Sequence, residues 1–208
     1  MKTLFFSLLI LFHAWSGKPI VKHTIPGGVT VLAVNTSEST VDWKAEKATG
    51  NHTGTVKIES GTLVMHCGLL SSGTVILDMG TMTVTDLSSS DKQKLEGNLR
   101  SDYFFYTDKF PRAQLDITAV NHNSEKALHF ITILGNLTLR GVTKRITFTA
   151  NVSKSDLNNF AADANLVINR RDFNIATSNL RYDTFIYKDI HLHVILKASR
   201  PEPLVSSL

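Results

Sequence analysis

The chain has 208 residues, of which 42% are hydrophobic, and its 22 basic and 18 acidic side chains give a formal net charge of +4. The basic residues are scattered, whereas nucleic-acid-binding proteins concentrate them in a stripe, so no nucleic-acid partner is expected. Cys67 is the only cysteine, which excludes an intrachain disulfide and predicts a buried, inert thiol.

The first residues follow the order of a secretory signal peptide. Lys2 precedes the apolar run 4–12, and Ala14 and Ser16 put small residues at the −3 and −1 positions of a cut after Ser16. The apolar run is shorter than the ~20 residues that a membrane-spanning helix needs. We therefore expect residues 1–16 to be a signal peptide, no membrane span, and a periplasmic or secreted protein.

The residues after the signal peptide are expected to form a lead-in over 17–36, broken at 26–28 by Pro-Gly-Gly, followed by short strands. Apolar and polar residues then alternate with the two-residue period of a half-buried strand. The sequence predicts a turn at 50–54 and a strand interruption at Ser60-Gly61. Expected strands are 40–46, 56–58, 63–67, 75–84, 115–120, 128–133, 161–168 and 186–196.

The clearest signal is a β-hairpin between residues 134 and 152. Leu137 and Leu139 alternate with polar residues before Gly141, and Ile146 and Phe148 do so after it. The connection is expected at 140–144, where the glycine can adopt a positive φ. One face of this hairpin should point into a hydrophobic core.

Residues 89–100 break the strand rhythm and predict one short helix. Ser90 to Gln93 fits a capping box, and Leu95 and Leu99 share one helical face. An aromatic segment, 103–110, follows the helix; it is expected to plug one end of the fold or to form the mouth of a binding site. Together with the strand spacing, these elements predict an all-β antiparallel barrel or sandwich.

Several motifs, taken together, resemble the YceI-like family of exported, lipocalin-like bacterial proteins. The matching segments are 41–47, 50–54, 77–79, 99–104, 109–111, 135–144 and 168–173. The resemblance implies an extended antiparallel β-barrel of about eight strands over residues 37–198. The tail at 199–208 contains Pro201 and Pro203 and is expected to be flexible. The resemblance also implies a hydrophobic tunnel that holds a long-chain isoprenoid, of polyprenyl or quinone type, or a similar amphiphilic lipid.

Two positions depart from the family pattern. Asn98 stands where the family usually has His, so proton chemistry proposed there for relatives does not carry over. Asn174 stands where Gly is common after the Arg-x-Asp-Phe motif; Asn is the next best residue after Gly at positive φ.

The resemblance and the strand pattern together suggest which residues line a ligand-binding tunnel. No catalytic residue and no metal are expected, and no cofactor other than the bound lipid. Pattern alone leaves open whether this interior is hollow or filled, and whether the protein is a homodimer. The expected ligand-binding residues are Val41, Trp43, Leu77, Phe104, Phe105, Phe110, Leu115, Ile117, Leu137, Leu139, Ile146, Phe148, Ile168 and Phe173.

Two other functions remain open at the level of sequence. His191 and His193 share the polar face of the last strand and could serve a metal-dependent enzyme, with His66 or His52 as a third ligand. A barrel with a filled core could instead be an interaction module of the bacterial envelope. The pair Arg170-Arg171 could meet a phosphorylated headgroup, although solvated surface charge is its default interpretation.

Overall fold

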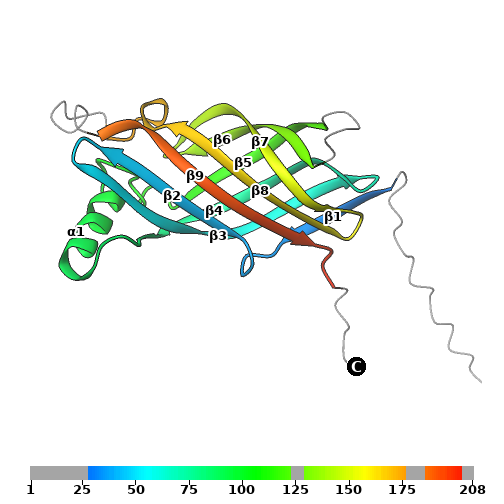
Figure 1. Ribbon diagram of the computed structural model, residues 1–208, viewed down its shortest axis with the longest axis horizontal. Helices are drawn as coiled ribbons and strands as arrows, with labels where there is room; N and C mark the ends of the chain where they lie inside the picture. Colours follow the sequence, from blue (N-terminus) through cyan, green and yellow to red (C-terminus); the bar gives the residue numbers. More distant parts are fainter. Residues whose placement is uncertain (1–27, 123–128, 177–185, 203–208) are drawn as a thin grey trace, which may run out of the picture.

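The computed structural model describes residues 28–122, 129–176 and 186–202, so the expected signal peptide and most of the expected lead-in lie outside the described residues (Figure 1). The described chain forms nine β-strands, one α-helix and one 3-10 helix. In chain order these elements are β1 (Val29–Val34), β2 (Thr40–Lys47), β3 (Gly50–His66), β4 (Leu69–Val84), α1 (Ser89–Arg100), β5 (Arg112–His122), β6 (Phe130–Leu139), β7 (Val142–Ser155), β8 (Asn159–Asn169), η1 (Arg170–Phe173) and β9 (Ile186–Ser199).

The strands form one antiparallel sheet, in the order β1-β3-β2-β9-β8-β7-β6-β5-β4, and the pairing of β3 with β4 closes it. Strands β2 to β9 make a closed eight-stranded barrel, which confirms the expected fold class. The extra strand, β1, pairs with the second half of β3 and with the end of β9. Strand β1 therefore continues the barrel wall beyond the start of β2. Helix α1 lies at the end of the barrel opposite β1 (Figure 1).

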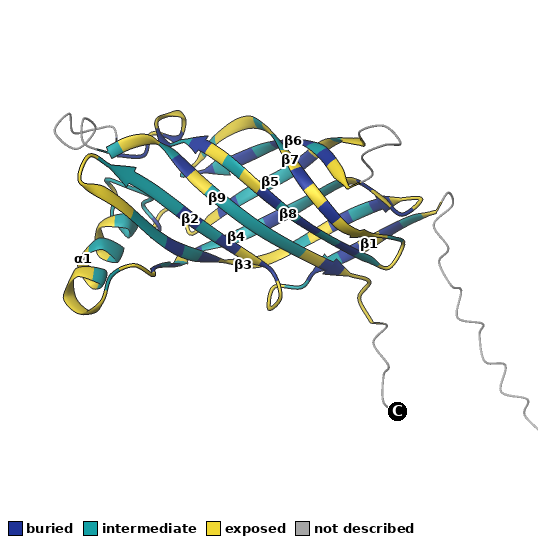
Figure 2. Ribbon diagram, viewed as in Figure 1, coloured by how far each residue is buried: buried dark blue, intermediate teal, exposed yellow. Residues whose placement is uncertain are grey.

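Alternation along the strands builds the interior of the barrel. In β6 the inward row of Ile131, Ile133, Gly135, Leu137 and Leu139 is buried, and the residues between them are more exposed. Figure 2 shows the same change between buried and exposed residues along most strands. A strand turns successive side chains to opposite faces, so each strand contributes one apolar row to the inside of the barrel.

The β6–β7 hairpin forms as predicted, but its connection is shorter than the expected 140–144. Leu139 pairs directly with Val142, which leaves Arg140 (φ 51°) and Gly141 (φ 73°) as a two-residue turn. Two positive φ angles are typical of a type I′ turn, whose twist matches that of the flanking strands. The remaining residues of the expected connection therefore belong to β7.

The β3–β4 hairpin uses the same kind of turn, and this overturns the expected burial of Cys67. Cys67 (φ 51°) and Gly68 (φ 81°) are the two turn residues, and the cysteine side chain is exposed. Burial was expected because free cysteines are among the most buried residues, but a residue in a two-residue turn projects beyond the sheet.

Residues 50–54 belong to β3, so the turn predicted there is wrong; the chain reverses at residues 48–49. Gly54 lies directly opposite Trp43, and a Cβ atom at this position would be 2.4 Å from Trp43 Cζ2 and 1.9 Å from the Thr83 carbonyl oxygen. The glycine thus makes room for the indole ring within a strand. The interruption expected at Ser60-Gly61 is also wrong, because β3 continues through a register shift.

Helix α1 forms where it was expected, but the capping box at Ser90 does not. The helix is preceded by Ser88, which makes no side-chain capping bond. Glu96 instead fixes the helix to the barrel: its Oε1 accepts hydrogen bonds from Thr83 Oγ1 (2.7 Å) and Val84 N (2.9 Å). These bonds lower the pKa of Glu96, Thr83 contributing most. The helices that the structure describes include none with the length and apolarity of a membrane span.

Candidate functional site

Two adjoining cavities occupy the inside of the barrel. The outer cavity, with a volume of about 100 Å³, lies at the α1 end, where Leu99 and the aromatic segment contribute to its wall. The inner cavity, of about 110 Å³, lies farther along the barrel and reaches Leu70 and Phe160. Apart from Arg170 and Tyr187 in the outer cavity and Gln114 in the inner one, both are lined by apolar residues or Trp43.

The two cavities meet at a shared set of side chains. Five strands contribute one residue each to this set, so the wall of one cavity passes without a break into the wall of the other. The shared residues are Val41, Leu77, Ala113, Leu137 and Leu192. This arrangement gives a narrow apolar space along the barrel axis rather than a single wide chamber.

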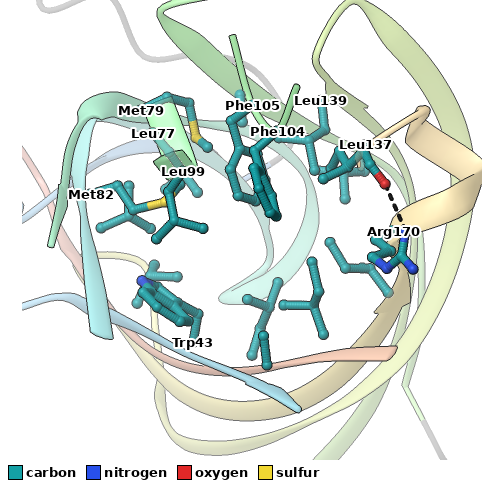
Figure 3. A pocket seen from close by; sticks show the side chains of 18 of the residues that line it. Trp43, Leu77, Met79, Met82, Leu99, Phe104, Phe105, Leu137, Leu139 and Arg170 are labelled. Carbon is teal, nitrogen blue, oxygen red and sulfur yellow. Dashed lines mark hydrogen bonds between the residues drawn. The ribbon is translucent and has the colours of Figure 1, made fainter. Parts of the chain in front are cut away.

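The structure brings together all but two of the residues expected to bind a ligand. Trp43 and Leu139 line the outer cavity with Phe104 and Phe105 (Figure 3), and Ile168 also contributes to its lining. The expected residues that line only the inner cavity are Leu115, Ile117, Ile146 and Phe148, and those that line both are Val41, Leu77 and Leu137. Their contact with a ligand remains a prediction.

Phe110 and Phe173 do not line either cavity. Phe110 packs against the β6–β7 turn, where a Cβ atom on Gly141 would be 2.6 Å from its ring. Phe173 is the last residue of η1, is 1% exposed and belongs to the hydrophobic core. Both are aromatic residues of family motifs, and both support the rim of the barrel instead of its interior.

The aromatic segment after α1 forms part of the wall at the α1 end. Phe104 and Phe105 line the outer cavity, and Tyr103 joins the segment to the chain after η1. Tyr103 Oη donates to the Ala176 carbonyl (3.1 Å), and Ala176 N donates to the Tyr103 carbonyl (3.0 Å). Tyr187, which is 52% exposed, also lines the outer cavity, so this cavity reaches toward the surface near the start of β9.

Arg170 is the main charged group at the outer cavity, and it is buried, with 1% exposure. Solvated surface charge was the default interpretation for this residue, and the structure overturns it. Its guanidinium donates to the carbonyls of Tyr187 (3.1 Å), Ile175 (2.9 Å), Ala176 (3.0 Å) and Ile186 (2.7 Å). These bonds join η1 to the start of β9 and hold the rim at this side of the cavity, opposite Trp43 in Figure 3.

The end of the barrel near β1 is filled. Leu32, Leu63 and Met65 are each 0% exposed, yet none of them lines either cavity. Met65 is the direct neighbour of Leu70, which lines the inner cavity, so packed side chains border the cavity at this end. The interior is hollow toward α1 and filled toward β1, a division that alternation alone left open.

Comparison with known proteins identifies the family. Residues 32–198 match the YceI-like domain. The chain belongs to the YceI-like family. Its Asn174 adopts the left-handed conformation (φ 56°) at the end of η1, as expected for the residue that replaces the common Gly.

The fold of this YceI-like domain is shared with several solved structures. BcnA of Burkholderia cenocepacia is 16% identical with a TM-score of 0.63, over 80% of this chain and 99% of that one. A polyisoprenoid binding domain from Saccharophagus degradans is 15% identical with a TM-score of 0.60, over 82% and 98%. The YCEI protein of Campylobacter jejuni is 18% identical with a TM-score of 0.53, over 95% and 100%.

One curated relative is similar in sequence over part of its length. The UPF0312 protein YE1254 of Yersinia enterocolitica is 34% identical over 97 residues, or 44% of this chain. The match spans 47% of that relative, so the chain covers about half of its length.

The two histidines considered for a metal site lie on the outer wall of the barrel. His193 Nε2 lies 2.7 Å from Asp163 Oδ2, and its Nδ1 lies 3.5 Å from Asp42 Oδ2. The hydrogen bond to Asp163 is the main cause that raises the pKa of His193. His191 also faces outward, and His52, considered as a third ligand, contacts Asp86 at 2.8 Å. Among residues 28–122, 129–176 and 186–202, no three His, Cys, Asp or Glu side chains are placed to hold a metal.

Sequence reasoning missed the small residues of the inner cavity. Ala150, Ala162 and Ala164 face inward and line it. Alternation along β7 and β8 could have placed them inside, but alanine gives a weak hydrophobic signal. Ile175, which follows η1 and lines the outer cavity, shows no periodic pattern that could have identified it.

Proposed function

We propose that this YceI-like protein is an exported, non-enzymatic binding protein that holds a long-chain isoprenoid, of polyprenyl or quinone type, or a similar amphiphile. The observation that carries the proposal is the pair of adjoining, almost wholly apolar cavities inside a closed barrel. Such a lining offers few hydrogen bonds, so the part of the ligand that it favours is a hydrocarbon chain.

The strength of binding would come from the hydrocarbon. Removing a methylene group from water contributes about 0.8 kcal/mol, so a long chain gains affinity with very few polar contacts. A single hydrocarbon chain also suits this narrow space, because eight-stranded barrels are only wide enough for side chains or one slender ligand.

Two further observations support the proposal. One structural neighbour, from Saccharophagus degradans, is described as a polyisoprenoid binding domain. The order of basic, apolar and small residues over 2–16 is that of an export signal, which would place the protein where envelope lipids occur.

The first test uses Trp43 as an optical probe, because its indole ring lines the outer cavity. Protein stripped of copurifying lipid is titrated with a polyprenyl quinone and, separately, with a polyprenyl phosphate. We expect a saturable change in tryptophan emission at about one ligand per barrel. Trp15 lies in the expected signal peptide, so the variant Trp43→Phe serves as the blank for any remaining signal.

Trp43→Phe should lose the optical change and keep ligand binding in native mass spectrometry. The substitution retains an aromatic ring and removes an indole N–H that has no acceptor among the described residues. Native mass spectra of protein purified from the bacterial envelope should also show a bound lipid. If the emission does not respond and both sets of spectra show only unliganded protein, the binding proposal is wrong.

A further inference from the structure

The inner cavity exists because one part of the barrel wall carries alanine at inward positions. On β8, Ala162 and Ala164 follow Phe160 along the inward row, and Ala150 of β7 is the direct neighbour of Ala164. All three alanines are at most 8% exposed and line the cavity. The hollow therefore coincides with a cluster of side chains that are too small to meet across the barrel.

The end of the hollow is defined just as clearly. Leu70 and Phe160, which are 1% and 2% exposed, line the last part of the inner cavity. Met65, which is 0% exposed, is the direct neighbour of Leu70 on β3 and does not line the cavity. A chain that enters from the α1 end would thus meet a closed floor.

We infer that Ala150, Ala162 and Ala164, together with the floor formed by Leu70 and Phe160, set the length of isoprenoid chain that the protein accepts. This inference rests on the proposed function. The outer cavity receives the part of the chain next to the headgroup, and the alanine-lined inner cavity receives its terminal units.

The length of the hollow gives an upper limit to the length of the chain. On β9 the lining runs from Ile186 to Leu196, which is about 33 Å of strand at ~3.3 Å per residue. A strand tilt of roughly 40° reduces this span to about 25 Å along the barrel axis. An extended hydrocarbon advances about 1.25 Å per carbon for bonds of about 1.5 Å, so this span sets an upper limit of about 20 chain carbons, or about five isoprene units.

The inner cavity alone accounts for the last part of that length. Its lining on β9 runs from the shared residue Leu192 to Leu196, which is about 13 Å of strand and about 10 Å along the axis. This distance corresponds to about eight chain carbons, or about two isoprene units. Filling the inner cavity should therefore shorten the accepted chain by about two units.

The experiment compares full-length wild type with Ala164→Leu, using prenyl alcohols of increasing length and native mass spectrometry to measure affinity. In the wild type, affinity should rise with each unit up to a limit of at most about five units and then level off. Ala164→Leu should level off about two units earlier and lose at least about tenfold in affinity for the five-unit alcohol. Asn165→Leu is the matched control, because this exposed neighbour faces the outer wall and should bind as the wild type does.

Each outcome is informative. If the wild type binds the alcohols and Ala164→Leu shows the same dependence on length, the inference is wrong and the proposed function stands. If the wild type binds none of them, the proposed function itself fails. Should Ala164→Leu prove unfolded by circular dichroism, Ala150→Leu fills the same cavity from β7, and an unchanged dependence on length in that variant would overturn the inference.

Discussion

Gly54 faces Trp43 across the β2–β3 pair, and Gly54→Ala tests whether that contact fixes the wall of the outer cavity. A Cβ atom would lie 1.9 Å from the Thr83 carbonyl oxygen and 2.4 Å from Trp43 Cζ2. Real Cβ atoms essentially never come within 3.0 Å of another heavy atom in this way, so something has to move. The nearer obstacle is backbone, and a shift of the Trp43 ring alone cannot remove the clash.

Overpacking of this kind costs typically about 1–3 kcal/mol, and we expect the upper part of that range because β4 itself has to shift. For a domain of this size, a loss of about 3 kcal/mol lowers the melting temperature by roughly 6–12 °C. The displaced indole should also change the tryptophan emission of the unliganded protein.

Urea unfolding followed by circular dichroism measures the free energy of unfolding, and Gly97→Ala provides the control. Nothing lies within 4 Å of a Cβ atom at Gly97, which is inside α1, so alanine there should stabilise the protein by about 0.5–1 kcal/mol. A change of less than about 0.5 kcal/mol for Gly54→Ala, with unchanged emission, would refute the reasoning, since that is the range of ordinary surface substitutions.

Three further predictions concern charged groups. Glu96→Ala should lower the free energy of unfolding by about 1–2 kcal/mol in urea titrations, because it leaves the N–H of Val84 without its acceptor. His193 has a raised pKa in the folded protein, so its contribution is fully present below about pH 6.5 and disappears as the pH rises through the folded value. Because the His193 side chain is 39% exposed, its contribution to the free energy of unfolding should stay under about 1 kcal/mol. Melting curves of His193→Asn measured over a range of pH should lack this pH dependence. If the variant keeps the pH profile of the wild type, the role given to Asp163 is wrong. Arg170→Met should cost at least about 3 kcal/mol, because it leaves four carbonyls without their donor, and a wild-type melting temperature would contradict this.

Much of the fold could be predicted from the sequence, because strand direction is a local property. Successive side chains of a strand point to opposite faces whatever lies around them, so the alternation in residues 137–148 placed Leu137, Leu139, Ile146 and Phe148 inside the barrel. The turn at Arg140-Gly141 and the helix over 89–100 likewise depend on residues that are close in sequence. The strand pattern was compatible with a barrel or a sandwich, and the motifs shared with the YceI-like family indicated the barrel.

The candidate site was predictable only in part, because its shape depends on what lies across the barrel. Nothing adjacent in sequence indicates that Arg170 is buried among carbonyl groups from two segments. Nor does the local sequence indicate that Gly54 lies within a strand, where the absence of a side chain leaves room for the indole ring of Trp43. Phe110 and Phe173 look like tunnel residues and instead support the rim.

The division of the interior into a hollow part and a filled part was also decided by tertiary structure alone. The sequence determined the inward direction of Leu137, Leu139, Ile146 and Phe148, and alternation with polar neighbours could also have placed Ala150 and Ala164 inside. Only the closure of the sheet and its register placed these alanines side by side, and gathered Leu32 and Met65 at the other end. Whether inward side chains meet or leave a cavity depends on their combined size at one level of the barrel, and that level is set by contacts between strands far apart in sequence.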